Sequence, residues 1–92
     1  MNHQPPCIAA RHYQAWLERK HGDIGGYRIS SHAAEESGEA IGAYNKLLEG
    51  RGDRAHLAQE WAQAILMLTI MGQVFLSDDE LDQAIVEEAF RR

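Results

Sequence analysis

Apolar residues recur at helical spacing in four stretches of the chain, and segments rich in glycine or proline separate these stretches. The first runs from about Pro6 to Lys20, and proline suits the first turn of a helix. The second covers roughly residues 32 to 49, with Ser31 as the expected N-cap and Gly50 just past its last turn. Each stretch predicts one amphipathic helix.

The third stretch, from about Arg54 to Phe75, is apolar on nearly every side between Trp61 and Met71. At 1.5 Å per residue it predicts a helix roughly 30 Å long. An all-round apolar surface is typical of a helix at the centre of a fold. That surface is also larger than three short neighbouring helices need, which favours a homo-oligomer.

The fourth stretch opens on a capping box, with Ser77 at the cap and Glu80 three residues later. The helix that follows is expected to run to about Phe90. Three of its residues are expected to face the core: Leu81, Ala84 and Ile85. The sequence thus predicts four helices, each with its own start or stop signal.

The length and composition of the chain fit one small globular domain. It has 92 residues, of which 45% are hydrophobic and 25% are charged. No convincing alternation of polar and apolar residues with period two occurs, so strands are not expected. We therefore predict that residues 1–92 form a single all-α domain, a four-helix bundle, with a polar start at residues 1–5.

Charge and cysteine content narrow the class of protein. Fourteen acidic residues against nine Lys and Arg give a net charge of −5, which argues against binding to a nucleic-acid polymer. A single cysteine, Cys7, excludes an internal disulfide and favours a reducing compartment. The most hydrophobic run, Trp61 to Leu76, is too short to cross a membrane, and no targeting segment is apparent. We expect a cytoplasmic protein without a membrane partner.

Several carboxylates fall on partly apolar faces of the second and third predicted helices. Glu36 and Glu39 are three residues apart and Glu35 and Glu39 four apart, spacings at which like charges repel. Glu60 begins a face of the central helix that continues through Gln63. Burying uncompensated carboxylates is costly, so a hard divalent cation, Mg²⁺ or Mn²⁺, is one candidate partner. Solvation, or attraction to the helix dipole, is the alternative.

Taken together, these motifs resemble the EExxE…ExxD pattern of MazG-like nucleotide pyrophosphohydrolases, members of the all-α NTP pyrophosphatase superfamily. The run Glu35–Glu39 matches the first motif, and Glu60-Trp61-Ala62-Gln63 follows after twenty residues in the place of the second. The resemblance extends from about Tyr13 to Ala89 and includes the order of the helices. It departs from the pattern at Gln63, where the family has aspartate.

The resemblance implies an enzyme that hydrolyses a nucleoside triphosphate to the monophosphate and pyrophosphate, with Mg²⁺ or Mn²⁺ held by the acidic motifs. It also implies a homodimer or homotetramer. Carried over by position, Glu36, Glu39 and Glu60 are metal ligands, with Gln63 in the last ligand position. Glu35 would hold a further ion, or orient or activate the attacking water, so Glu35 and Glu36 are the expected catalytic residues.

Gln63 leaves a second interpretation open. An amide oxygen can bind Mg²⁺ but brings no charge, so the affinity for metal should fall. The alternative function is a catalytically impaired MazG-like helical protein that acts as a nucleotide-sensing or protein-interaction module.

Groups that would bind the substrate are few in this acidic chain. Lys46 lies seven residues after Glu39 on the same helical face, and Arg54 and Arg28 are further candidates for contacts with phosphate. The glycine-rich segment from Gly22 to Ser30 is expected to be a loop. It would either close over a nucleotide, with Tyr27 stacking on the base, or serve as an ordinary connection.

Overall fold

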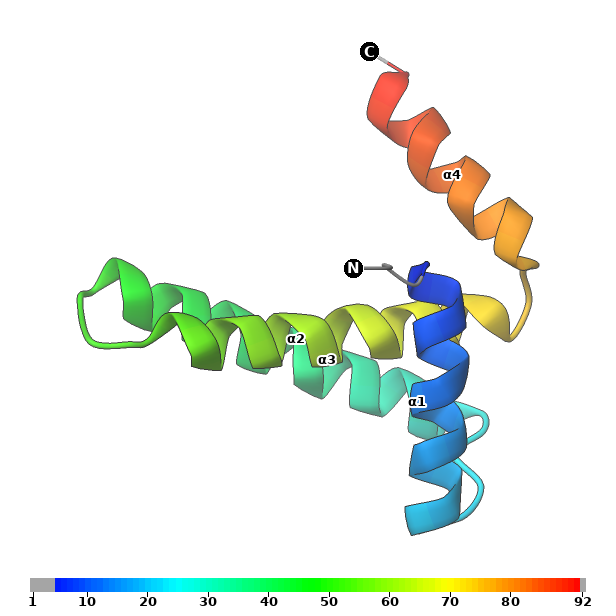
Figure 1. The fold of residues 1–92 in the computed structure, drawn as a ribbon, viewed down its shortest axis with the longest axis horizontal. Helices are drawn as coiled ribbons and strands as arrows, with labels where there is room; N and C mark the ends of the chain where they lie inside the picture. Colours follow the sequence, from blue (N-terminus) through cyan, green and yellow to red (C-terminus); the bar gives the residue numbers. More distant parts are fainter. Residues whose placement is uncertain (1–4, 92) are drawn as a thin grey trace.

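The computed structural model describes residues 5–91, and in that range it contains four α-helices and no β-strand. The helices are α1 (Pro6–His21), α2 (Tyr27–Leu48), α3 (Arg54–Gln73) and α4 (Asp78–Phe90) (Figure 1). The prediction of an all-α helical fold is therefore confirmed. Of the polar start predicted at residues 1–5, only Pro5 lies within the described residues. None of the described helices is both long and apolar enough to span a membrane.

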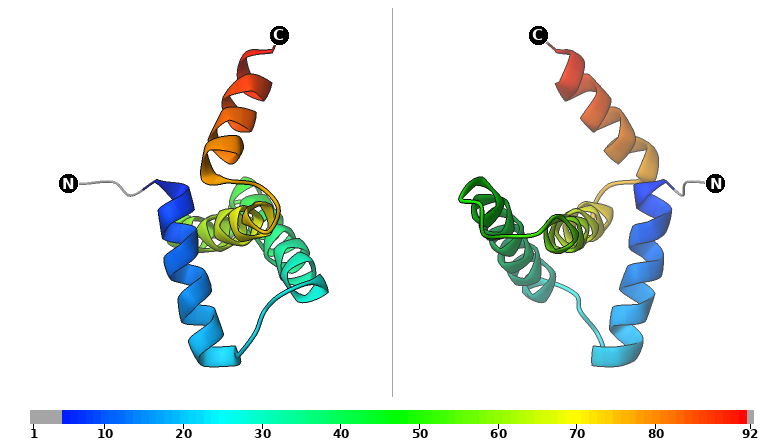
Figure 2. Two further views of the ribbon diagram at one scale, coloured as in Figure 1. Left: turned by 90° about the vertical axis from the view of Figure 1, so that its right-hand side faces the viewer. Right: turned by 60° about the vertical axis from the view of Figure 1, so that its left-hand side comes forward.

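Helices α2 and α3 form an antiparallel hairpin, and α1 crosses this hairpin near its open end (Figures 1 and 2). Helix α3 packs against each of the other three helices. This central position is the one that its all-round apolar surface predicted. The far end of the hairpin, around the turn that joins α2 to α3, extends well beyond α1 (Figure 1).

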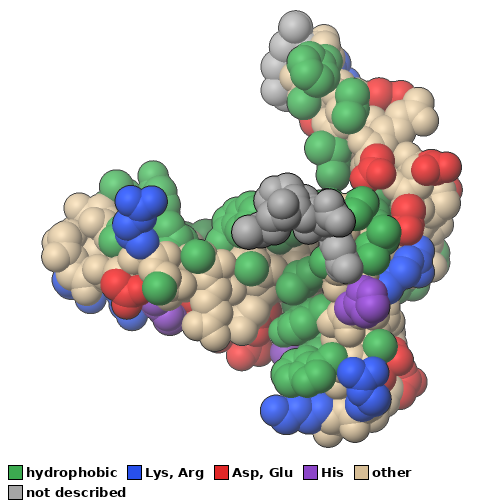
Figure 3. Space-filling model, viewed as in Figure 1, with side chains coloured by type: hydrophobic (Ala, Val, Ile, Leu, Met, Phe, Trp, Pro, Cys, Tyr) green, Lys and Arg blue, Asp and Glu red, His purple; other side chains and the backbone are tan. Residues whose placement is uncertain are grey.

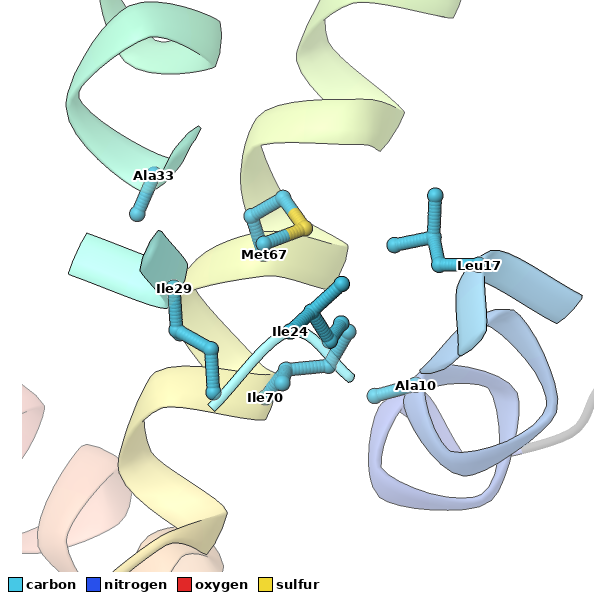
Figure 4. Close-up of a cluster of buried hydrophobic side chains, with 7 residues drawn as sticks. All are labelled: Ala10, Leu17, Ile24, Ile29, Ala33, Met67 and Ile70. Atoms are coloured by element: carbon cyan, nitrogen blue, oxygen red, sulfur yellow. The ribbon is translucent and has the colours of Figure 1, made fainter. Parts of the chain in front are cut away.

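The hydrophobic core lies where α1 crosses the hairpin (Figure 4). Met67 and Ile70 of α3 are at its centre, and less than 2% of the surface of each is exposed. Side chains from α1, from the loop after it and from the first turns of α2 surround them: Ala10, Leu17, Ile24, Ile29 and Ala33. Burying a side chain of this size contributes about 1.5–3 kcal/mol, so this crossing is the main source of tertiary stability.

The N-terminus of α2 is earlier than the sequence pattern predicts. The helix begins at Tyr27, after Gly26 in a left-handed conformation with φ 64°, so the prediction that Ser31 caps it is wrong. Ser31 is exposed inside the helix, whereas Ile29 is only 3% exposed. The additional turn places Ile29 against the core, and this burial outweighs the hydrogen bond that a serine cap at residue 31 would supply.

The hairpin turn follows the predicted pattern. Gly50 has φ 75°, and its N–H donates to the carbonyl oxygen of Leu47 at 3.0 Å. The N–H of Arg51 donates to the carbonyl oxygen of Lys46, also at 3.0 Å. This pair of bonds is a Schellman motif, which needs a left-handed residue and therefore favours glycine.

Helix α4 has the predicted capping box but not the predicted burial. The Ser77 hydroxyl accepts from the N–H of Glu80 at 3.2 Å, and the Glu80 carboxylate accepts from the N–H of Ser77 at 3.1 Å. Leu81 is partly buried against α3, but Ala84 and Ile85 are exposed. The prediction that Ala84 and Ile85 face the core of the chain is therefore wrong. The reason is the direction of α4, which points away from the other helices (Figure 2).

Candidate metal centre

Three carboxylates converge between the two helices of the hairpin. Glu36 and Glu39 come from α2 and Glu60 from α3, and one oxygen of each lies within 4.8 Å of the others. The spacing of three residues places the two α2 side chains on one face, and the antiparallel packing of α3 brings Glu60 opposite them. Within residues 5–91 this is the only group of three or more Asp, Glu, His or Cys side chains that come this close to one another.

The cluster has buried oxygens that nothing in the described chain satisfies. Oε2 of Glu36 and Oε2 of Glu60 are buried, and neither has a hydrogen-bond partner among the described residues. Burial, and then the neighbouring charges of Glu39 and Glu60, raise the pKa of Glu36, while His32 acts in the opposite direction. A buried carboxylate among like charges is unfavourable unless a cation or a proton compensates it.

The donor set fits a hard divalent cation. Mg²⁺ and Mn²⁺ prefer carboxylate oxygens, and Mg²⁺ binds them at about 2.0–2.1 Å in octahedral geometry. Two ligand oxygens on one such ion are therefore roughly 3–4 Å apart. The oxygens of Glu36, Glu39 and Glu60 lie within 4.8 Å of one another, so small side-chain rotations would bring them to that spacing.

A cleft of about 360 Å³ opens beside the carboxylates. Its α2 wall includes Glu39, Gly42 and Lys46, and its α3 wall includes His56 and Glu60. A Cβ added to Gly42 would meet no atom within 4 Å, so the space in front of this glycine is free. Lys46 thus lies where its spacing from Glu39 predicted, beside the acidic cluster and along a cleft that a ligand can enter.

His56 also lines the site, although the acidic motifs of the sequence do not predict it. Its Nδ1 lies 3.9 Å from Oε1 of Glu60, four residues later on α3. The backbone N–H of His56 donates to Oδ1 of Asp53, the N-cap of α3, at 2.8 Å, and this bond orders the first turn. The four-residue spacing from Glu60 was the signal that could have found it.

Tyr13 is a second neighbour of the site that the sequence motifs do not predict. Its side chain is partly buried where α1 approaches the hairpin, and its ring stacks on Trp16 with centroids 5.7 Å apart. Burial, and then the charge of Glu36, raise the pKa of the Tyr13 phenol. No sequence signal relates Tyr13 to Glu36, because the packing of α1 alone brings them together.

The other residues predicted for the site, two near the metal ligands and one for phosphate binding, are not part of the carboxylate cluster. Glu35 is exposed on α2, where its charge contributes to the raised pKa of its neighbour Glu36. Gln63 is partly buried on α3, one turn after Glu60. Arg54 lines a groove on the other face of the hairpin, together with Trp61.

The predicted nucleotide-binding loop is mostly helical. Residues 27–30 form the first turn of α2, so the prediction of a loop from 22 to 30 holds only up to residue 26. Tyr27 is 92% exposed and lies outside the acidic cleft. Arg28 donates to the carbonyl oxygen of Asp23 and lines a separate cavity of about 100 Å³ with His21 and His32. The structure therefore does not place Tyr27 or Arg28 beside the carboxylates.

The chain matches none of the protein-family models, curated proteins or solved structures with which it was compared.

Proposed function

We propose that this protein is a nucleoside triphosphate pyrophosphohydrolase of the MazG-like type, dependent on Mg²⁺ or Mn²⁺, that releases pyrophosphate and a nucleoside monophosphate. The observation that carries the proposal is the convergence of Glu36, Glu39 and Glu60, with two buried oxygens that have no hydrogen-bond partner among the described residues. The order of the acidic motifs along the chain supports it. In the same proposal, the active form is a homodimer or homotetramer.

The chain's own residues would divide the work between binding and positioning. Glu36, Glu39 and Glu60 would hold the cation, and the Gln63 amide oxygen would occupy the last ligand position. A bound cation supplies charge neutralisation for the phosphates and lowers the pKa of a bound water. Glu35, exposed beside Glu36, would orient the attacking water or accept its proton.

The cleft beside the cluster would accommodate the triphosphate. The Lys46 ammonium lies on the same side of the hairpin as Glu39 and Glu60 and would bind phosphate oxygens. His56 would hold Glu60 in position and, when protonated, add a second positive charge. Arg54, Arg28 and Tyr27 line other surfaces and would reach the substrate only if the protein or its assembly rearranged.

A second function rests on a different observation. Gln63 replaces a charged ligand with a neutral one, and the hairpin exposes large apolar side chains such as Ile41 and Trp61. A protein with this combination would be a nucleotide-sensing or protein-interaction module that retains the helical scaffold and lacks turnover. Turnover separates the two functions, because the module would lack it even where it binds a metal.

Calorimetric titration with Mn²⁺ and Mg²⁺, with and without a non-hydrolysable nucleoside triphosphate, tests the proposal. The variants are Glu36→Gln, Gln63→Asp and, as a matched control, Glu18→Gln, which changes an exposed carboxylate of α1. We expect the wild type and Glu18→Gln to bind metal, and Glu36→Gln to bind at least about 10-fold more weakly. Gln63→Asp should bind more tightly than the wild type.

Pyrophosphate release from a panel of nucleoside triphosphates then separates the enzyme from the module. Metal-dependent release that Glu36→Gln abolishes would support the enzyme. Metal binding restored only in Gln63→Asp would support the impaired module. No metal binding by any variant, with or without nucleotide, would refute the site.

A further inference from the structure

The chain exposes more surface than a compact protein of its size. Its accessible surface is 6966 Å², whereas a folded monomer of 10.4 kDa exposes about 5,400 Å². The difference of about 1,600 Å² per chain is about twice the roughly 800 Å² that each partner buries in an interface of standard size.

An apolar groove of about 770 Å³ runs between the outer halves of α2 and α3. Ile41 and Tyr44 form its α2 side, and Leu57 and Trp61 form its α3 side. Ile41 is 61% exposed and Trp61 59% exposed, a state that costs free energy for side chains of this size. This groove lies on the face of the hairpin opposite the acidic cleft, so its occupant would not block Glu39 or Glu60.

Helix α4 carries the complementary surface. Ile85, Val86 and Phe90 are 69%, 56% and 82% exposed, and no residue of α4 is fully buried. Figure 3 shows hydrophobic side chains along the edge of α4 that faces the hairpin and acidic side chains along its opposite edge. The helix is therefore amphipathic, and its own chain covers the apolar face only in part: Leu81 and Ile85 line a cavity shared with α1 and α3, while Val86 and Phe90 lie beyond it.

The charges of the two surfaces are also complementary. Helix α4 contains six carboxylates and no Lys or Arg. Arg54 lines the groove and forms no ion pair with any described carboxylate. An acidic helix seated in the groove would place one of its polar edges beside this cation.

We propose that the α2–α3 groove is the docking site for α4 of a second copy of this chain. Each protomer carries both surfaces, so in the proposed dimer the exchange is reciprocal and the two chains are related by a twofold axis. Each dimer then contains two equivalent contacts between a helix and a groove. This assembly does not depend on a metal or a nucleotide, and it goes beyond the proposed catalytic function.

Single charges placed on each surface test the arrangement. Ile41→Glu changes the groove, Ile85→Glu changes α4, and Phe75→Glu is the control because Phe75 is 90% exposed and lines neither surface. All three positions are exposed in one chain, so circular dichroism should show native helix content in each variant. Light scattering coupled to size exclusion, and sedimentation across a concentration series, then give the oligomeric state.

We expect the wild type and Phe75→Glu to be dimers or larger. In Ile41→Glu and Ile85→Glu the dissociation constant should rise at least about 100-fold, because association would bury an unpaired carboxylate in an apolar contact. An equimolar mixture of the two variants provides the decisive comparison. Its heterodimer places both substitutions in one contact and leaves the other intact, so it should form at least about 10-fold more tightly than either variant alone.

Three results would overturn the proposal. A monomeric wild type would show that no second copy covers the groove. Dimerisation unaffected by Ile85→Glu would show that α4 is not the occupant. Loss of dimers in both variants without recovery in the mixture would show that the two surfaces do not contact each other across the interface.

Discussion

The two halves of the α2–α3 hairpin both carry large apolar side chains, but these side chains have different environments. In the inner half, which α1 crosses, Ile29 is 3% exposed and Met67 is 1% exposed. In the outer half, near the turn, Ile41 and Trp61 are more than half exposed. The same pair of helices therefore builds a core at one end and an open apolar surface at the other, because α1 reaches only the first.

The candidate metal centre lies at the border between these halves. Glu36 is one turn beyond the buried Ala33, and Tyr13 of α1 approaches it from the core side. Partial burial at this border raises the pKa of Glu36, whereas the exposed Glu35 beside it only adds to the local negative charge. The two adjacent carboxylates therefore differ in burial because of their position relative to α1, since they are the same type of residue.

The largest effect on the free energy of unfolding is expected from a substitution in the core of the inner half. Met67→Ala removes a side chain from the centre of the core and should lower the free energy of unfolding by about 2–5 kcal/mol. Met71→Ala removes the same atoms one turn later, where the side chain is 39% exposed, and should cost about 1 kcal/mol or less. Urea denaturation followed by circular dichroism measures both. Equal losses would contradict the comparison.

The next largest effect on stability is expected from metal binding at the candidate metal centre, on the border between the two halves. Mn²⁺ at about 100 times its dissociation constant should raise the free energy of unfolding by about 2.7 kcal/mol, because only the folded hairpin assembles the three carboxylates. Glu36→Gln, which should bind at least about 10-fold more weakly, should lower this stabilisation to about 1.4 kcal/mol or less at the same Mn²⁺ concentration, and Glu18→Gln should retain it. Thermal or urea unfolding with and without Mn²⁺ measures the difference. Stabilisation that is undiminished in Glu36→Gln would place the ion elsewhere.

A smaller effect on stability is expected from replacing two glycines, one inside α2 and one in the turn that follows it. A Cβ at Gly38 would meet no atom within 4 Å, so Gly38→Ala should stabilise the helix by about 0.5–1 kcal/mol. Gly50 has φ 75°, so Gly50→Ala should destabilise the turn by about 1–2 kcal/mol. Unfolding midpoints of the two variants should shift in opposite directions. A shift in the same direction would contradict this view of the hairpin.

The smallest effect expected is the pH dependence of the metal-free protein. Because the pKa of Glu36 is raised on folding, the folded state holds this proton more tightly than the unfolded state does. The free energy of unfolding should therefore contain a contribution that is present at low pH and is lost as the pH rises through the raised pKa. Glu36→Gln should remove that contribution. A series of unfolding curves in chelator, compared between wild type and variant, measures it.

Local signals in the sequence determined the helices and several of their ends. Hydrophobic periodicity predicted four helices, Gly50 predicted the end of α2, and Ser77 with Glu80 predicted the start of α4. The spacing of Glu36 and Glu39 placed their side chains on one face of a helix. These features depend on residues within one or two turns of each other, and backbone geometry alone relates such residues.

Features that depend on contacts between distant segments were decided by the tertiary structure. Burial of Ile29 in the core moved the start of α2 to Tyr27, although Ser31 offered a better local cap. The approach of α1 brought Tyr13 to Glu36, and the hairpin brought Glu60 to Glu39. Burial energy depends on which segment covers a side chain, and the periodicity of one helix carries no information about its neighbour. For that reason the sequence determined the helices of this protein, while the packing of α1 and the hairpin decided which faces became a core, a carboxylate cluster or an open groove.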